Sequence, residues 1–214
     1  MVIKAVIFDM DGTILNTLDD VVDAVNHSLS KFGFKEYSKE DIKNAVGNGV
    51  RILMKRLVPE DVSEQVFENF LEYFIKYYSE NMNNKTAPYD DIISMLEKLR
   101  ADGYKIGVLS NKFDSAVKEL SNKYFPNLVD VAVGQKDDVN EKPAPDGVFE
   151  VAKLLGVAVE ECVYVGDSEV DIQTAQNAGI DCISVTWGFK TVDFLYKNGA
   201  TRLAYIPEDI CELL

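Results

Sequence analysis

Short apolar runs recur along the chain, and each is followed by turn residues or by a helical pattern. Several of these runs are rich in β-branched residues and have the length of strands: 4–8, 105–109, 129–133, 162–165 and 182–186. Runs with so little polar interruption are typical of strands that are buried on both faces, as strands of a parallel sheet are. The pattern therefore predicts one parallel sheet built from these strands.

Between the later runs, the apolar positions repeat at helical spacing. The segments that fit amphipathic helices are 91–101, 116–124, 146–155 and 169–178. Gly103, Gly156 and Gly179 follow three of these segments, where a helix end favours a left-handed residue. Alternating strands and helices predict βαβ units, and hence an α/β fold with a doubly wound, Rossmann-like parallel sheet.

The stretch from Leu18 to Lys85 interrupts this alternation. It contains no convincing strand, and its apolar positions fit helices at 18–32, 39–46, 50–57 and 61–83. Because this is too much chain for one crossover helix, we expect an all-helical domain inserted after the first strand. The predicted division gives residues 17–86 to the helical domain and residues 1–16 and 87–214 to the α/β core.

The charge balance restricts the partners of the protein. The 214 residues include 36 acidic and 22 basic side chains, for a formal net charge of −14. Nucleic acid and anionic membranes are themselves polyanions, so we expect neither as a partner. An anionic substrate would need a locally basic site within this acidic chain. The charged string Lys136-Asp137-Asp138 is predicted to be a solvated loop.

The histidine and cysteine residues restrict the kinds of metal site that the chain can form. The single histidine, His27, excludes a zinc site with several histidine ligands. Cys162, Cys182 and Cys211 have no metal-ligand spacing, and we expect buried free thiols in a reducing cytosol. No apolar run approaches the length of a membrane span, and no signal-peptide pattern precedes the first strand. We therefore expect a cytoplasmic protein.

Polar residues that could take part in catalysis or ligand binding follow the predicted strands. They are Asp9-Met10-Asp11-Gly12-Thr13, Ser110-Asn111-Lys112, Lys142-Pro143, and Gly166-Asp167-Ser168 with Asp171. The carboxyl ends of parallel strands meet at one edge of the sheet, so these side chains are expected to converge there. Several acids at one place repel each other unless a cation joins them. Oxygen ligands of this kind suit Mg²⁺, which protein carboxylates and a substrate phosphate can coordinate together.

The spacing of Asp9 and Asp11 has a specific use. In an extended segment, residues two apart point to the same side, so both carboxylates can face one substrate. One could attack phosphorus while the other serves the leaving oxygen. Gly12 permits close approach of the backbone, and Lys142 would neutralise charge on the phosphoryl oxygens.

In order and position, these four motifs resemble the signature motifs of the haloacid-dehalogenase superfamily of phosphatases. The resemblance implies a magnesium-dependent phosphomonoester hydrolase that works through an aspartyl-phosphate. It makes Asp9 the nucleophile and Asp11 the general acid and base. Ser110 and Asn111 would hold phosphoryl oxygens, and Lys142 would orient the nucleophile and the phosphoryl group.

The resemblance also implies a metal site. Its ligands would be the Asp9 carboxylate, the main-chain carbonyl of Asp11 and the Asp167 carboxylate. Asp171 would orient the waters of the Mg²⁺ ion rather than bind the ion directly.

The inserted domain resembles the helical type-1 cap of this superfamily. Its loop Val46-Gly47-Asn48-Gly49-Val50-Arg51 resembles the cap loop of phosphoglycolate phosphatases, as do Ser110-Asn111-Lys112 and Thr186-Trp187-Gly188-Phe189. The implied substrate is 2-phosphoglycolate or a similar small phosphorylated metabolite, with Gly47, Asn48, Gly49 and Arg51 in contact with it. Two alternatives stay open: Arg51 could instead be an exposed helix cation, and Lys112 could either support the anion site or only begin its helix.

Other functions share parts of this pattern. A pyrophosphatase or nucleotidase of the same family would use the same core motifs. A phosphosugar mutase resembling β-phosphoglucomutase is a weaker alternative, because Gly47-Asn48-Gly49 does not look like the mutase cap loop. A non-catalytic scaffold is disfavoured, because Asp9, Asp11, Lys142 and Asp167 are all present. We expect a monomer or a homodimer.

Overall fold

The computed structural model describes residues 2–136 and 139–214. The chain divides into two compact units, Met1–Asn16 with Pro88–Leu214, and Thr17–Ala87. Within the predicted loop Lys136-Asp137-Asp138, the two aspartates lie outside the described residues.

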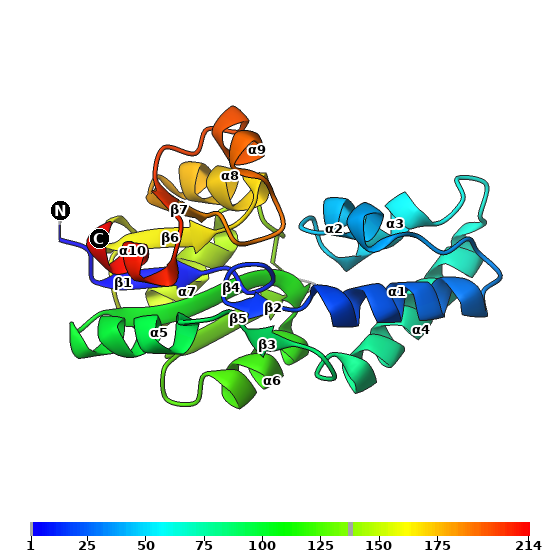
Figure 1. The fold of residues 1–214 in the computed structure, drawn as a ribbon, viewed down its shortest axis with the longest axis horizontal. Helices are drawn as coiled ribbons and strands as arrows, with labels where there is room; N and C mark the ends of the chain where they lie inside the picture. Colours follow the sequence, from blue (N-terminus) through cyan, green and yellow to red (C-terminus); the bar gives the residue numbers. More distant parts are fainter. Residues whose placement is uncertain (1, 137–138) are drawn as a thin grey trace. The chain divides into compact units, whose positions relative to one another are not determined.

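The first unit contains a parallel sheet with the strand order β5-β4-β1-β6-β7-β8 (Figure 1). Its strands are β1 (Ala5–Phe8), β4 (Lys105–Phe113), β5 (Val131–Gln135), β6 (Cys162–Gly166), β7 (Asp181–Val185) and β8 (Leu203–Ala204). The parallel sheet predicted from the apolar runs is confirmed. The structure adds β8, and it extends β4 beyond Leu109 as far as Phe113.

Apolar side chains on the strands bind helices to this sheet. The helices of the unit are α5 (Ile92–Ala101), α6 (Asp114–Tyr124), α7 (Asp146–Leu155), η1 (Val159–Glu161), α8 (Glu169–Ala178), α9 (Val192–Lys197) and α10 (Pro207–Glu212). All four residues of β1 are buried. Ala5 and Ile7 pack in one cluster with Val151 of α7 and Ala175 of α8. This packing fixes the carboxyl end of β1, from which the Asp9–Thr13 segment leaves the sheet.

The second unit is helical, with α1 (Leu18–Lys31), α2 (Lys39–Ala45), α3 (Val50–Leu57) and α4 (Glu64–Asn81). Ser38 and Ser63 accept backbone N–H groups at the starts of α2 and α4, as helix caps do. The Asp20 carboxylate accepts the amides of Lys85 and Thr86 at 2.9 and 2.8 Å, which pins the chain after α4 to α1. The short strands β2 (Leu15–Asn16) and β3 (Ala87–Pro88) form a separate sheet.

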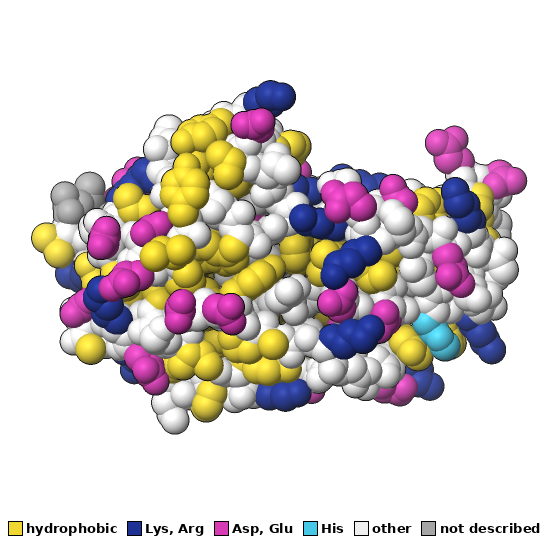
Figure 2. All heavy atoms as spheres, in the orientation of Figure 1, with side chains coloured by type: hydrophobic (Ala, Val, Ile, Leu, Met, Phe, Trp, Pro, Cys, Tyr) yellow, Lys and Arg dark blue, Asp and Glu magenta, His cyan; other side chains and the backbone are white. Residues whose placement is uncertain are grey.

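Charges of both signs are interspersed on the face shown in Figure 2. All three cysteines are free, as predicted, but Cys162 is buried whereas Cys182 and Cys211 are partly exposed, so the expectation of three buried thiols is wrong. Within the described ranges, no helix combines the length and the apolar composition that crossing a membrane requires.

Candidate active site

The segment after β1 turns sharply at the edge of the sheet. The amides of Ile14 and Leu15 donate to the Met10 carbonyl at 3.1 and 3.0 Å, and Met10 itself is fully buried. Gly12 has φ +88°, and a Cβ there would lie 2.4 Å from an oxygen of Asp167. A glycine is therefore required for this loop to lie against the end of β6.

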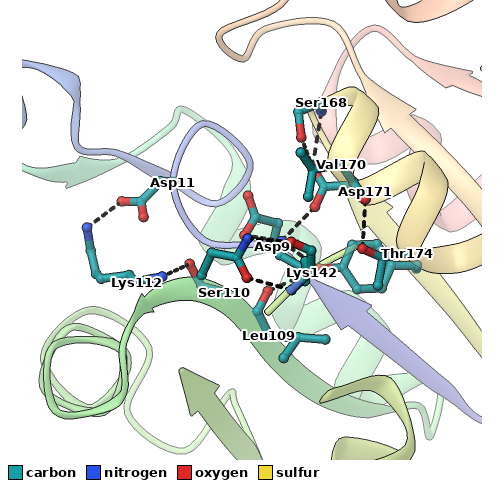
Figure 3. Close-up of polar contacts among 12 residues, drawn as sticks. Asp9, Asp11, Leu109, Ser110, Lys112, Lys142, Ser168, Val170, Asp171 and Thr174 are labelled. Carbon is teal, nitrogen blue, oxygen red and sulfur yellow. Dashed lines mark hydrogen bonds and ion pairs between the residues drawn. The ribbon is translucent and has the colours of Figure 1, made fainter. Parts of the chain in front are cut away.

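Lys142, in the segment between β5 and α7, holds three groups together. Its Nζ donates to Asp9 Oδ1 at 2.9 Å, to Asp171 Oδ1 at 2.7 Å and to the Tyr164 hydroxyl at 2.9 Å (Figure 3). These contacts use all three donors of an ammonium group. Burial alone would lower the pKa of Lys142, but Asp171 and Asp9 raise that pKa well above its usual value. Lys142 is therefore a permanent cation that fixes the orientation of Asp9.

Three buried carboxylates meet beside Lys142. Asp9, Asp167 and Asp171 each offer an oxygen, and these atoms all lie within 4.8 Å of one another. Burial raises the pKa of Asp9 to about 7, even though Lys142 opposes the shift. Burial, followed by the charges of Asp171 and Asp9, raises the pKa of Asp167 well above its usual value. A divalent cation would relieve both the desolvation and the repulsion, so this donor set fits Mg²⁺.

The hydrogen bonds distinguish the three acids. Asp171 Oδ2 accepts from the Ser168 amide and hydroxyl at 3.1 and 2.7 Å, and its Oδ1 accepts from Lys142. Asp167 Oδ2 accepts from the Phe189 amide at 2.6 Å. Asp9 and Asp167 each keep one oxygen that accepts no hydrogen bond from any described residue. Those two oxygens are thus better placed to bind a metal than either oxygen of Asp171.

The carboxyl end of β4 contains an irregularity that brings consecutive side chains into the site. The register between β4 and β5 shifts between Leu109 and Phe113. Ser110, Asn111 and Lys112 are all buried there, although side chains of a regular strand alternate between the two faces. A bulge of this kind re-aims side chains beside a site.

Asn111 and Lys112 have different partners. The Asn111 amide exchanges two hydrogen bonds with the backbone of Lys142, at 3.0 and 2.8 Å. Asn111 therefore positions Lys142, a role that the sequence did not suggest. Lys112 Nζ lies 2.9 Å from Asp11 Oδ1, and the two side chains are 5% and 16% exposed. Of the two interpretations of Lys112, the contact with Asp11 favours a place in the site, and α6 begins only at Asp114.

The loop Gly47-Asn48-Gly49 lies in the helical unit. Gly47 and Gly49 have φ of +125° and +84°. Arg56 donates to the Ala45 carbonyl at 2.7 Å and to Asn48 Oδ1 at 2.9 Å, so it holds the loop in place. Sequence reasoning missed Arg56.

Arg51 is engaged with an acid of its own unit. Its guanidinium lies 2.7 Å from Glu68 and packs over the Phe67 ring, at 5.4 Å from the centroid. A contact between Arg51 and a substrate stays a prediction.

Four further residues bear on the core site: sequence reasoning did not name Tyr164 and Tyr89, and it named Trp187 and Phe189 only within the string Thr186-Trp187-Gly188-Phe189, without a contact. Tyr164 accepts from Lys142 and donates to the Leu109 carbonyl at 3.1 Å. The Trp187 indole donates to the Thr13 carbonyl at 2.9 Å, and the Phe189 amide donates to the Asp167 carboxylate. Burial, and then the charges of Asp167 and Asp11, raise the pKa of Tyr89. The strand-end rule could have found Trp187 and Phe189, because they follow β7 at the same edge.

Comparisons with known proteins agree on one family. The family model described as haloacid dehalogenase-like hydrolase matches residues 6–185. A phosphoglycolate phosphatase of Aquifex aeolicus is 31% identical over 191 residues, which cover 87% of this chain and 86% of the relative. Pyrophosphatase PpaX of Bacillus mycoides is 26% identical over 215 residues, which cover 100% and 96%. A crystal structure from Lactobacillus delbrueckii subsp. bulgaricus is 40% identical, with a TM-score of 0.94 and coverage of 100% and 98%.

Proposed function

The chain belongs to the haloacid dehalogenase-like hydrolases, and from this premise we propose that it is a magnesium-dependent phosphomonoester hydrolase acting through an aspartyl-phosphate. One observation carries the proposal. Asp9 and Asp11 each lie 2.9 Å from a buried lysine, and Asp9 shares its cluster with Asp167. This arrangement supports the assignment of a nucleophile, a proton donor and a metal site that act on one phosphoryl group.

Asp9 and Asp11 take part in both half-reactions, the transfer of the phosphoryl group to the protein and its transfer to water. In the first, a carboxylate oxygen of Asp9 attacks phosphorus, the bond from phosphorus to the ester oxygen breaks, and Asp11 gives its proton to that oxygen. In the second, Asp11 takes a proton from water as the water attacks phosphorus, which releases phosphate and restores Asp9. Lys142 keeps one oxygen of Asp9 in place throughout, because its hydrogen bond fixes the carboxylate rotamer.

The remaining core residues would bind the phosphoryl group and the ion. Ser110 and Asn111 would donate to phosphoryl oxygens. Asp9, the main-chain carbonyl of Asp11 and Asp167 would hold Mg²⁺, with Asp171 orienting its waters. When bound, Mg²⁺ supplies positive charge to the phosphoryl oxygens as negative charge develops on them.

The substrate we propose is 2-phosphoglycolate. The phosphoglycolate phosphatases of Aquifex aeolicus and Psychrobacter arcticus, 31% and 29% identical to this chain, support this choice. Pyrophosphate is the second candidate, because Pyrophosphatase PpaX of Bacillus mycoides aligns over the full chain. Both compounds have an anionic leaving group.

A substrate panel tests the proposal. Phosphate release from 2-phosphoglycolate, pyrophosphate, a nucleoside monophosphate and glucose 1-phosphate is measured with Mg²⁺ and with excess chelator. We expect metal-dependent turnover with the highest kcat/KM for 2-phosphoglycolate, and a loss of several orders of magnitude in Asp9→Asn, because this variant lacks the attacking charge. The proposal is wrong if chelator leaves turnover unchanged, or if Asp9→Asn keeps more than about a tenth of the rate, a barrier change of only about 1.4 kcal/mol.

A further inference from the structure

Buried cations are scarce in this acidic protein. Of its 22 lysines and arginines, those that are buried among the described residues are Lys112 and Lys142. Each pairs with one acid of the segment after β1, Lys142 with Asp9 and Lys112 with Asp11. The proposed chemistry gives Lys142 a role but leaves Lys112 without one. Burying an ammonium group is unfavourable, so a second one beside the reacting groups calls for an explanation.

The backbone holds Lys112 in a defined place. Its amide lies 3.2 Å from the Ser110 hydroxyl, inside the irregular end of β4. Gly134 of β5 packs directly against it, since a Cβ on Gly134 would lie 2.6 Å from the Lys112 carbonyl oxygen. The Gly134 amide donates to Asp114 Oδ1 at 3.0 Å, which ties the next residues to the same strand. The direction of the Lys112 side chain toward Asp11 is therefore built into the sheet.

The contact with Asp11 locates the ammonium relative to the reaction. Under the proposed function, on which this inference rests, Asp11 serves the oxygen of the leaving group. An ammonium 2.9 Å from Asp11 Oδ1 therefore lies on the leaving-group side of phosphorus, whereas Lys142 is engaged with Asp9. Figure 3 shows the Lys112–Asp11 pair to one side of the cluster around Lys142.

We propose that Lys112 determines specificity by receiving an anionic group that the leaving group carries close to the ester oxygen. The carboxylate of 2-phosphoglycolate and the second phosphate of pyrophosphate both have this chemistry. An ammonium group has three donors and can bridge Asp11 and a substrate oxygen. A carboxylate held beside these poorly exposed side chains needs such a partner, since an unpaired charge away from water is strongly disfavoured. By contrast, the Arg51 side chain is 46% exposed and already paired with Glu68.

A charge series of two-carbon esters tests the inference. The substrates are 2-phosphoglycolate, ethyl phosphate and phosphoethanolamine, whose leaving groups are anionic, neutral and cationic but similar in size. For the wild type, we expect kcat/KM to fall in that order, with at least a 30-fold preference for 2-phosphoglycolate over ethyl phosphate. In Lys112→Met this preference should fall about 30-fold, equivalent to about 2 kcal/mol, the low end of the loss when a buried charge loses its partner. Lys112→Arg keeps the cation and should retain most of the preference.

Controls separate this role from a structural one. Lys118→Met removes an exposed lysine of α6 that pairs with Asp114, and it should leave all three rates unchanged. Equal losses for all three esters in Lys112→Met would mean that Lys112 only positions Asp11, and the inference would be wrong. It would also be wrong if the wild type showed no preference between 2-phosphoglycolate and ethyl phosphate, a result that needs no variant. A selective loss in Arg51→Ala but not in Lys112→Met would move the anion site to the helical unit. If the wild type hydrolyses none of the esters and no pyrophosphate, the proposed function fails instead.

Discussion

Replacing Asp9, the proposed nucleophile, should stabilise the protein in the absence of metal. Burial raises the pKa of Asp9 from its usual 3.8 to about 7. Because the pKa of the folded state lies above that of the unfolded state, the native protein binds this proton more tightly. The resulting contribution to stability is present in full below about pH 4 and is lost as the pH rises through about 7. Above pH 7, the folded protein must hold an unfavourable buried charge.

The size of the effect follows from the shift. At about 1.36 kcal/mol for each pKa unit, the raised pKa of Asp9 lowers the free energy of unfolding, relative to its value at low pH, by up to about 4 kcal/mol at pH 8 and by about 2 kcal/mol at pH 5, where Asp9 ionises only in the unfolded state. Asp9→Asn removes the charge but keeps an oxygen that can accept from Lys142. The variant should therefore be more stable than the wild type in chelator, and its advantage should be about 2 kcal/mol larger at pH 8 than at pH 5.

Urea unfolding followed by circular dichroism measures this difference. Both proteins are unfolded in excess chelator at the two pH values, and the midpoints and slopes give the free energies of unfolding. Adding Mg²⁺ at pH 8 should stabilise the wild type more than the variant, because a ligand stabilises the state that binds it. The variant could instead be equally or less stable than the wild type at pH 8 in chelator. That result would refute the claim that the buried acids destabilise the protein when no cation is bound.

Three other outcomes follow from the same geometry. Asp11→Asn should slow both formation and breakdown of the phosphoryl enzyme. In single-turnover assays, its phosphorylation step should suffer less with a nitrophenyl ester, which needs little protonation, and equal losses for good and poor leaving groups would argue against Asp11 as the acid. Tyr164→Phe removes one of the three acceptors of Lys142 and should lower kcat about 10-fold with little change in KM; a rise in KM alone would contradict a positioning role. Ca²⁺ should inhibit in competition with Mg²⁺, because its larger and looser coordination would let Asp9 bind through both oxygens and misplace the attacking one; full activity with Ca²⁺ alone would contradict this.

The sequence predicted the parts of the site that depend on local pattern. Strands buried on both faces leave continuous apolar runs, and polar residues at their carboxyl ends must meet at one edge of the sheet. Asp9, Asp11, Lys142 and Asp167 could be found in this way, although their roles stay proposals. The parallel sheet and its βαβ order followed from the same pattern, which the structure confirms.

Other features depend on distant contacts that no local pattern contains. The apolar run after Lys105 ends at Leu109, so the sequence could not show that a bulge continues β4 to Phe113 and brings Lys112 to Asp11. Nor could it show that Asn111 holds the backbone of a residue 31 positions away. In the helical domain, Arg51 and Arg56 look alike in sequence. The structure pairs the first with Glu68 and sets the second against the glycine loop.

The central claim is that the phosphoryl group passes through the carboxylate of Asp9. The stereochemistry at phosphorus tests it most directly, with a phosphorothioate substrate that is chiral at phosphorus through sulfur and two oxygen isotopes and is hydrolysed in water carrying the third oxygen isotope. Transfer to Asp9 and then to water involves two in-line displacements, each of which inverts the configuration, so the account predicts net retention in the thiophosphate released. Net inversion would show that water attacks the substrate directly, and it would contradict Asp9 as the nucleophile.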